Sequence, residues 1–476
     1  MKSHVRPPDG GAEPFDVDQR EVRELLARFS VDEPVHLVFM GTKPDIIKQY
    51  PLYKELVARG LQTAVFHSGQ HTAHEYSGGM LDEFGITVDV SLVMEHGLTL
   101  GARVAALITA ANAVFTVAAE TGHTLIPYIH GDTATSMGVG VAAYMNRVAC
   151  VHVEAGIRTM TLSREYLMGH YEDFNRGAFD WSAYLAGHRE EKNYTLGSME
   201  PFPEQFNTRV SDAATGLHAA PVELDRRFLL GEGFPADSIV VTGNTVVDAT
   251  EEARSKAKDS PIFERFPLLA QKQFIRVCIH RRENTNDRQR FLCYFEAMEK
   301  LLAIGHNVLW VSLVGTEWAL EHYGLTDRLS ALEQEYPDSL IVTQVWPEYA
   351  DVIAAFLSCS VLVTDSGSIQ EEANILQIPC VTLRFGTDRG ESLLAGGNVL
   401  APPLSADFVA AVVDHAVTHR DDLKGELLYG TGSSARVVDE VLKRVKVGTG
   451  LFRSEEEAMR LPGTDSDWPG EENRLA

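Results

Sequence analysis

The sequence is poor in positive charge. Its 42 Lys and Arg residues stand against 67 Asp and Glu residues in a chain of 476, so the net charge is −25 at pH 7. This deficit argues against sequence-independent binding to nucleic acid and against attraction to an anionic membrane surface. We therefore expect neither as a partner, and an anionic ligand needs a local cationic pocket.

Paired cysteines and long apolar runs are missing as well. The five cysteines are far apart, with no CxxC pair and no Cys/His set at zinc spacing, which argues against a disulfide framework or a structural zinc. The first 16 residues lack the apolar core of a signal peptide. The most apolar stretch, Leu98–Ala119, includes Arg103 and Asn112 and indicates an amphipathic core helix. We expect a soluble, reduced, cytoplasmic protein.

The sequence does contain a regular alternation of short Val- and Ile-rich runs with helical patterns, which is typical of parallel β-α units. The runs form two groups, so the pattern predicts an α/β fold with two doubly wound domains that meet at a cleft. The expected strands are His36–Met40, Thr63–His67, Leu125–His130, Ala149–Val153, Ser238–Thr242, Ile275–Ile279, Asn307–Val311, Leu340–Val345, Val361–Thr364 and Cys380–Leu383.

The same pattern divides the chain into segments. We expect a flexible N-terminal extension (1–33), an N-terminal domain (34–236), a C-terminal domain (237–430), a C-terminal helix that packs back (431–447) and a polar tail (448–476). Residues 160–200 interrupt the rhythm of the N-terminal domain. They are rich in Tyr, His, Arg and Glu, have no clear strand and predict a helical excursion or a lid.

Polar residues follow the expected strands, where open parallel sheets bind their ligands. After Thr364, the Ser366-Gly367-Ser368 turn precedes a helix, and Ser368 and Glu371 have the spacing of a capping box. A helix N-terminus attracts phosphate, and a carboxylate one turn further can accept hydrogen bonds from a ribose. The motif therefore indicates a nucleotide diphosphate, although simple helix capping would explain it too.

Charged residues follow three other strands. His280-Arg281-Arg282 is the densest cationic cluster in this acidic chain and can bind phosphate, unless it is a surface ion-pair cluster. Asp132 and Glu154 each end a strand of the first domain. Burial and mutual repulsion can raise the pKa values of such carboxylates, so that one acts as base and another as acid. Asp132 is alternatively a helix cap.

These motifs resemble those of the bacterial non-hydrolysing UDP-N-acetylglucosamine 2-epimerases. The resemblance covers roughly His36 to Leu442, apart from Met160–Glu200. It implies a GT-B-like architecture of two Rossmann-like domains, of which the C-terminal one binds UDP. The matching segments are Gly41–Lys48, Gly69–His71, His130–Thr133, His152–Thr159, Thr242–Ala249, His280–Asn284 and Thr364–Glu372.

The resemblance also implies a reaction. Members of this family remove the C2 proton of the sugar and expel UDP, which leaves a 2-acetamidoglucal that is protonated on the other face as UDP returns. By resemblance, Asp132, Glu154 and a third carboxylate handle protons, and His280 lies near the diphosphate. We identify the third carboxylate as Glu204, because Pro201–Asn207 keeps the prolines of the family motif. The spacing from Glu204 to Pro221–Glu223 also follows the family without a gap. Glu172 is the reserve candidate, and 160–200 is then an insertion.

The remaining site residues follow from the same resemblance. No metal and no cofactor are implied, and a homodimer is expected. A second, activating UDP-sugar site is implied at Gln70 and His71. The residues implied to bind UDP are Lys43, Arg282, Ser366, Gly367, Ser368 and Glu372.

Several positions depart from the family pattern, mostly on the sugar side. Lys43 replaces the usual Arg, Gln205 the second Glu of a pair, Thr208 an Arg, and Gly390 a Pro. Four readings therefore stay open: an epimerase, a variant that releases UDP and N-acetylmannosamine by hydrolysis, a GT-B glycosyltransferase, and a UDP-sugar binding protein without activity.

Overall fold

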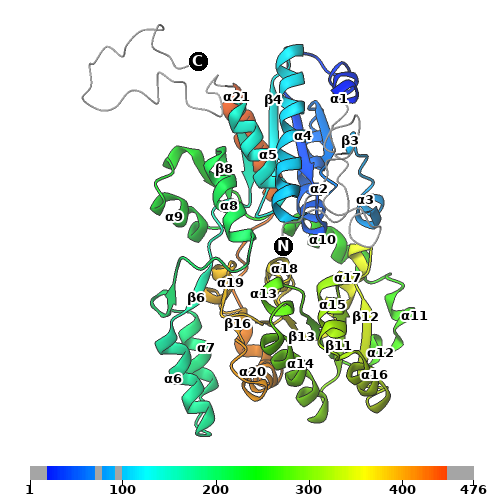
Figure 1. The fold of residues 1–476 in the computed structure, drawn as a ribbon, viewed down its shortest axis with the longest axis vertical. Coiled ribbons are helices and arrows are strands. Elements are labelled where there is room, and N and C mark those ends of the chain that lie inside the picture. The colour runs from blue at the N-terminus through cyan, green and yellow to red at the C-terminus, as the bar shows by residue number, and fades with distance from the viewer. Residues whose placement is uncertain (1–18, 70–77, 92–98, 447–476) are drawn as a thin grey trace, which may run out of the picture.

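The computed structural model describes residues 19–69, 78–91 and 99–446, which form two α/β domains stacked along the long axis of the molecule (Figure 1). Each domain is built on a parallel sheet flanked by helices. Gln70 and His71, the predicted activator residues, lie outside the described residues. Each strand expected from the sequence is present, with its ends shifted by at most two residues.

The N-terminal domain contains a parallel sheet in the order β3-β2-β1-β4-β5-β8-β9. Its strands are β1 (Val35–Met40), β2 (Thr63–His67), β3 (Val90–Ser91), β4 (Leu125–His130), β5 (Cys150–Val153), β8 (Thr215–Ala220) and β9 (Ile239–Val241). The helices around it are α2 (Lys43–Ala58), α3 (Gly79–Phe84), α4 (Leu100–Thr121), α5 (Ala134–Met145), α8 (Glu204–Ala213) and α9 (Glu223–Gly231). Because β9 pairs with β8, the chain leaves this domain after Val241, and the boundary expected at residue 236 is too early.

The C-terminal domain contains a second parallel sheet, in the order β12-β11-β10-β13-β14-β16. Its strands are β10 (Phe274–Cys278), β11 (Val308–Ser312), β12 (Leu340–Gln344), β13 (Cys359–Thr364), β14 (Cys380–Thr382) and β16 (Asn398–Leu400). Its helices are α11 (Ile262–Arg265), α12 (Pro267–Gln271), α13 (Arg282–Thr285), α14 (Arg288–Ala303), α15 (Val314–His322), α16 (Thr326–Glu335), α17 (Tyr349–Leu357), α18 (Gly367–Leu376), α19 (Gly390–Leu394) and α20 (Ala406–Thr418).

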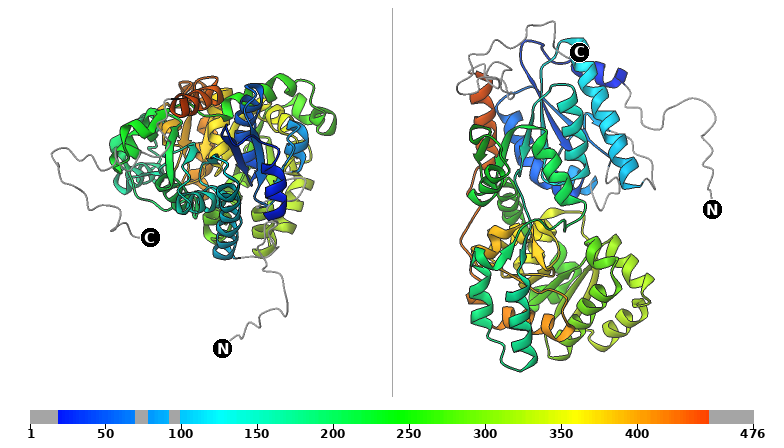
Figure 2. Two further views of the ribbon diagram at one scale, coloured as in Figure 1. Left: turned by 90° about the horizontal axis from the view of Figure 1, so that it is seen from above. Right: turned by 60° about the vertical axis from the view of Figure 1, so that its left-hand side comes forward.

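Residues 160–200 form a helical hairpin, α6 (Arg164–Asn175) and α7 (Trp181–His188), between two short strands, β6 (Met160–Leu162) and β7 (Tyr194–Thr195). The expectation of no strand here is wrong. The strands were hidden because each is only two or three residues long and pairs with distant segments, β6 lying between β7 and β15 (Gly386–Thr387). The hairpin lies beside the C-terminal domain (Figure 2), although its sequence position is in the N-terminal one.

The ends of the described chain are also packed. Helix α1 (Gln19–Leu26) buries Val22, Leu25 and Leu26 against a core that includes α4, so residues 19–26 are not the flexible extension that the sequence suggested. Helix α4 is long and apolar enough to cross a membrane by length and composition alone. Here its apolar face packs against α1 and α5. Helix α21 (Ser433–Lys446) returns to the N-terminal domain and contacts α2.

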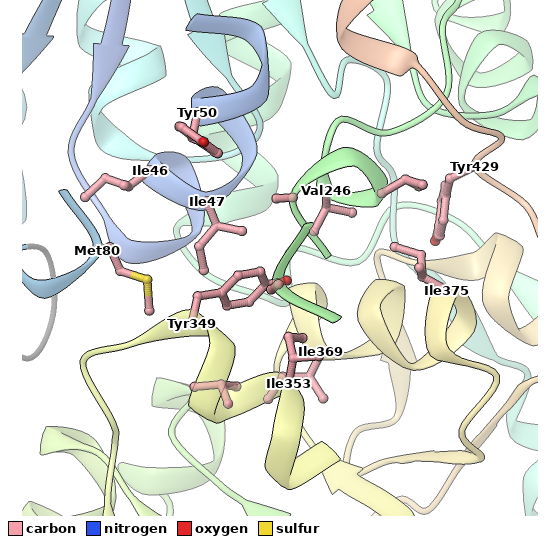
Figure 3. Packing of buried hydrophobic residues seen from close by; sticks show 14 of the residues in the cluster. Ile46, Ile47, Tyr50, Met80, Val246, Tyr349, Ile353, Ile369, Ile375 and Tyr429 are labelled. Atoms are coloured by element: carbon pink, nitrogen blue, oxygen red, sulfur yellow. The ribbon is translucent and has the colours of Figure 1, made fainter. Parts of the chain in front are cut away.

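An apolar cluster joins the two domains on one side of their interface (Figure 3). Ile47 of α2 lies close to Tyr349 of α17, and α10 (Val246–Ala257) contributes Val246 beside them; Tyr50 and Ile353 belong to the same cluster. Burial of these apolar side chains stabilises the contact between the domains, although the hydrophobic effect itself does not favour one orientation of the contact. The carboxyl ends of both sheets are thereby held facing each other.

Candidate active site between the two domains

The strand ends of the two domains bring the charged motifs of the sequence to one interface. Asp132 follows β4, Glu154 follows β5, His280 follows β10 and Ser366 follows β13. Glu154 adopts a left-handed backbone with φ of 67°, which is uncommon outside glycine and is often found at functional positions.

Glu154 lies at the centre of a buried ionic network between the domains. The Nζ atom of Lys48 is 2.5 Å from the carboxylates of both Glu154 and Glu371. Arg389 bridges the same two carboxylates, with Nη2 2.5 Å from Glu154 and Nε 2.5 Å from Glu371. All four side chains are at most 4% exposed. Lys48 and Glu154 belong to the N-terminal domain, and Glu371 and Arg389 belong to the C-terminal domain. The network therefore connects the two domains across their interface.

This network fixes the protonation state of Glu154. Burial alone would raise the pKa of its carboxyl, but Lys48, Arg389 and His130 outweigh burial and hold the pKa well below its usual range. The raised pKa that burial and mutual repulsion can produce in a strand-end carboxylate is therefore not found at Glu154. The reason is that two cations, from 106 residues earlier and 235 residues later in the chain, surround it.

Asp132 has the opposite environment. Its side chain is partly buried, and Asn207 Nδ2 donates a hydrogen bond to its main-chain carbonyl at 2.9 Å. Burial raises the pKa of Asp132, Arg389 opposes this, Glu204 and Asp388 add to it, and the result is a pKa of about 6. Such a carboxyl can exchange protons near neutral pH.

Glu204 begins α8 and faces the C-terminal domain. Its Oε1 atom accepts a hydrogen bond from Arg281 Nη1 at 2.6 Å, and its Oε2 atom is buried without a hydrogen-bond partner. Glu172 instead lies exposed on α6. The structure thus brings Glu204, and not Glu172, into the electrostatic environment of Asp132.

His280 is paired with a buried carboxylate. Its Nδ1 atom lies 3.0 Å from Asp365 Oδ1, and Asp365 also accepts hydrogen bonds from the main-chain nitrogens of His280 and Arg281 and from Asn284. Burial lowers the pKa of His280, but Asp365 outweighs burial and raises it to about 10. His280 is therefore an imidazolium at neutral pH, fixed at the end of β10.

The predicted phosphate turn begins α18, but not through the expected capping box. The helix starts at Gly367 with Ser366 as N-cap, and Glu371 binds Lys48 and Arg389 instead of capping the helix. A Cβ atom at Gly367 would lie 3.3 Å from the Arg389 guanidinium, so glycine lets this cation approach the first turn. Ser368 is partly exposed beside it. The helix N-terminus and the guanidinium lie side by side at this turn, and Arg389 also pairs with Glu154, Glu371 and Asp388.

The remaining predicted UDP-binding residues take different positions. Glu372 is buried and accepts a hydrogen bond from Tyr349 Oη at 2.7 Å, and burial raises its pKa to about 7. Lys43 donates to the carbonyl of Trp346 at 2.5 Å, and burial lowers its pKa to about 8. Arg282 is exposed at the start of α13.

Sequence reasoning missed several charged residues of this interface as site residues: Lys48, Arg281, Glu371, Asp388 and Arg389. Lys48, Arg281 and Glu371 lie inside motifs described above, whereas Asp388 and Arg389 directly precede Gly390, a position that departs from the family pattern. A Lys inside an otherwise apolar helix face was the available signal for Lys48, because a buried Lys requires a paired carboxylate.

Three other findings concern cavities, metal ligands and cysteines in the described residues. A cavity of about 790 Å³ opens beside α10 and α17, but its lining includes none of the carboxylates discussed above. In the described parts of the chain, no three His, Cys, Asp or Glu residues are arranged to hold a metal ion. All five cysteines are free.

Fold and site together define a class: a GT-B-like α/β protein with two Rossmann-like domains and a charged site between them. A family model described as UDP-N-acetylglucosamine 2-epimerase matches residues 54–194 and 186–443. The chain therefore belongs to the UDP-N-acetylglucosamine 2-epimerase family of enzymes.

Individual relatives agree with this assignment. A Bacillus subtilis UDP-N-acetylglucosamine 2-epimerase is 27% identical over 418 residues, which cover 85% of this chain and 94% of the relative. The crystal structure of the Methanocaldococcus jannaschii UDP-GlcNAc 2-epimerase in complex with UDP-GlcNAc and UDP is similar, with a TM-score of 0.69, 22% identity and coverage of 86% and 99%. The Neisseria meningitidis enzyme bound to UDP-GlcNAc has a TM-score of 0.68 at 24% identity, with coverage of 86% and 100%.

Proposed function

We propose that this protein interconverts UDP-GlcNAc and UDP-ManNAc by inverting C2 of the sugar, without net hydrolysis. The observation that carries the proposal is Asp132, a partly buried carboxyl with a pKa of about 6 in the interface where Arg281 and Arg389 contribute positive charge. An ordinary surface carboxylate would be a weaker base at neutral pH. Family membership and the UDP-GlcNAc complexes of structural neighbours support the substrate class.

In the proposed reaction, a carboxylate takes the proton from C2. The electrons of the C2–H bond form a C1=C2 double bond, and the C1–O bond breaks, so that UDP leaves with its electron pair. UDP then adds back to C1 while a second acid delivers a proton to the opposite face of C2. Asp132 and Glu204 are the proposed proton carriers.

Glu154 has a different part in this proposal. Its carboxylate oxygens are occupied by Lys48, Arg389 and His130, and it stays ionised. It becomes available as the proton-handling residue that the family resemblance implies only when one of these partners moves to the substrate. In the closed arrangement its charge keeps Lys48 and Arg389 in place, where they can offset the developing charge of the leaving diphosphate.

The nucleotide is proposed to bind against the C-terminal domain. The His280 imidazolium and the first turn of α18, with Ser366, Gly367 and Ser368, are the groups suited to the diphosphate. Glu372 is suited to the ribose hydroxyls, and Lys43 and Arg282 add positive charge. The second UDP-sugar site at Gln70 and His71, the homodimer and the cytoplasmic location stay predictions.

The test is incubation of the purified protein with UDP-GlcNAc in deuterated water, followed by proton and phosphorus NMR. We expect UDP-ManNAc, deuterium at C2 of both sugars and a constant total of UDP-sugar. Net accumulation of UDP with free N-acetylmannosamine would identify the hydrolysing alternative instead. Unlabelled, unchanged UDP-GlcNAc would contradict both.

A further inference from the structure

The insertion connects the two domains a second time. We call residues 160–195, from β6 to β7, the strap. At its base the N-terminal domain holds both ends together, because Thr159 Oγ1 donates to the Glu200 carbonyl at 2.6 Å and Thr159 N donates to Gln205 Oε1 at 3.2 Å. From this base the chain crosses to the C-terminal domain and returns (Figures 1 and 2).

Aromatic side chains anchor the strap to α20. Tyr171, Phe174, Phe179 and Tyr184 all lie with ring centroids 5.4–5.9 Å from Phe408. These are edge-to-face contacts, which are favourable beyond the area they bury. The strap is therefore fixed to the C-terminal domain as part of the hydrophobic core of that domain.

The strap also covers the edge of the C-terminal sheet. Strand β16 is the last strand of that sheet, and Tyr184 Oη donates to the Leu400 carbonyl at 2.8 Å. Leu400 N donates in turn to His188 Nε2 at 3.2 Å, while His188 Nδ1 donates to the Tyr184 carbonyl at 2.8 Å. Burial lowers the pKa of His188 to about 4, consistent with this neutral ring. An exposed edge strand is thereby paired by two side chains of the strap.

The most informative contact is the pairing of β6 with β15. Gly386 lies opposite Thr161, and Leu162 N donates to the Phe385 carbonyl at 3.2 Å. A Cβ atom at Gly386 would be 2.6 Å from the Met160 carbonyl oxygen, and one at Gly390 would overlap the Met160 sulfur. Gly390 stands where the family usually has Pro. The strap backbone leaves no room for a side chain at Gly386, whereas at Gly390 the atoms in the way belong to the Met160 side chain.

The loop between these glycines carries Arg389. Asp388 and Arg389 follow β15 directly, and Arg389 binds Glu371 of its own domain and reaches Glu154 across the interface. The strap thus contacts the loop from one side while Glu154, six residues before the strap begins, binds the same loop from the other. The Arg389 guanidinium is therefore held by two contacts from nearby parts of the chain, one from β6 to β15 and one from Glu154 to Arg389 itself.

We propose that the strap is a positioning element: it seats the 386–390 loop so that Arg389 bridges Glu154 and Glu371, and it restrains the two domains from opening during the reaction. The second part rests on the proposed function, in which UDP and the glycal exist as separate molecules in the site. Any opening at that stage lets them escape. A strap that limits opening would therefore increase the fraction of turnovers that end in an epimer.

The test compares Gly386→Ala, which pushes β6 away from β15, with Gly169→Ala in α6, where an added Cβ meets no atom within 4 Å. Tyr184→Phe is a milder variant that removes only the bond to the Leu400 carbonyl. With UDP-GlcNAc, we expect Gly386→Ala to release about tenfold more free UDP and glycal per epimer formed than Gly169→Ala, as for the loss of one or two net hydrogen bonds. Tyr184→Phe should show a smaller increase of the same sign.

A conformational readout separates the strap from the chemistry. With UDP alone, hydrogen exchange at Leu162 and small-angle scattering should show faster exchange and a larger radius of gyration for Gly386→Ala than for the control. If exchange at Leu162 or Leu400 rises in either variant while UDP retention and radius match Gly169→Ala, the strap is only a cover and the proposal is wrong. If neither the wild type nor any variant incorporates deuterium at C2, the proposed function is wrong. The scattering result with UDP then still decides whether the strap restrains opening of the domains.

Discussion

The Nη2 atom of Arg389 lies 2.5 Å from the Oε1 atom of Glu154, although 235 residues separate them in the chain. One residue follows a strand of the N-terminal sheet, and the other follows the small β15 strand of the C-terminal domain. Both side chains are buried, so the domains are joined at the candidate site by a charge pair that water does not screen.

The network that includes this pair predicts a strong stability effect at Lys48. Lys48→Met leaves Glu154 and Glu371 buried with one cation fewer, and removal of one partner of a buried pair costs about 3–5 kcal/mol. Lys54→Met is the matched control, since the Lys54 side chain is 60% exposed and pairs with Glu252. The control should change stability by less than about 1 kcal/mol. Chemical denaturation followed by tryptophan fluorescence measures both, and equal midpoints would show that the network does not support the fold.

The choice between two carboxylates predicts a difference in activity. Glu204→Gln removes a proposed proton carrier and should reduce deuterium incorporation at C2 by about 100-fold or more. Glu172→Gln changes an exposed carboxylate on α6 and should leave the rate unchanged. UDP affinity, measured by calorimetry, should stay within a few fold in both variants. Loss of labelling in Glu172→Gln, with normal labelling in Glu204→Gln, would reverse the assignment of the third carboxylate.

The pKa of Asp132 predicts the acid side of the pH profile. A base with a pKa of about 6 is protonated and inactive below that pH, so kcat/KM should fall about tenfold per pH unit there. Asp132→Asn should abolish labelling at C2, whereas Asp82→Asn, at an exposed position of α3, should keep the wild-type profile. Initial rates measured between about pH 4.5 and about pH 8 test this, because that range spans the titration of such a base. A profile that stays flat below pH 6 contradicts the assignment of Asp132 as the base.

The His280–Asp365 pair predicts a dependence of stability on pH. Although burial opposes it, His280 lowers the pKa of Asp365 to about 2, so the stability from this group is present above its unfolded pKa of 3.8 and is lost as pH falls towards 2. The pKa of His280 is raised to about 10, so its contribution is complete below 6.5 and is lost as pH rises towards 10.

Asp365→Asn should therefore lower the free energy of unfolding by on the order of 2 kcal/mol, with the largest drop in Tm between about pH 4 and about pH 6.5, where both wild-type groups are charged. Asp327→Asn, at an exposed position of α16, is the control. Thermal unfolding across the pH range measures both variants. A deficit of Asp365→Asn that does not depend on pH would show that the pair acts only through packing.

Much of the fold was predictable because it depends on local pattern. Alternating apolar runs specify the strands, and the residues after β4, β5, β10 and β13 follow from the rule that ligands bind at the carboxyl ends of parallel strands. Strands such as β3, β6 and β7 were missed because two or three residues give no periodic signal. The capping box at Ser368 was wrong because Glu371 finds stronger partners in Lys48 and Arg389.

The sequence by itself determined the α/β class, the two domains, the acidic charge that demands a local cationic pocket, and the position of Asp132, Glu154 and His280 at strand ends. These depend on composition and on spacing over a few residues. Only the tertiary structure decided which strand-end carboxylate has a raised pKa and which cations bind Glu154. It also decided that residues 160–195 pack on the domain to which they do not belong in sequence. Such outcomes depend on partners that are distant in the chain, 235 residues apart for Glu154 and Arg389. Burial makes the energy of each charge depend on those partners and not on its own segment.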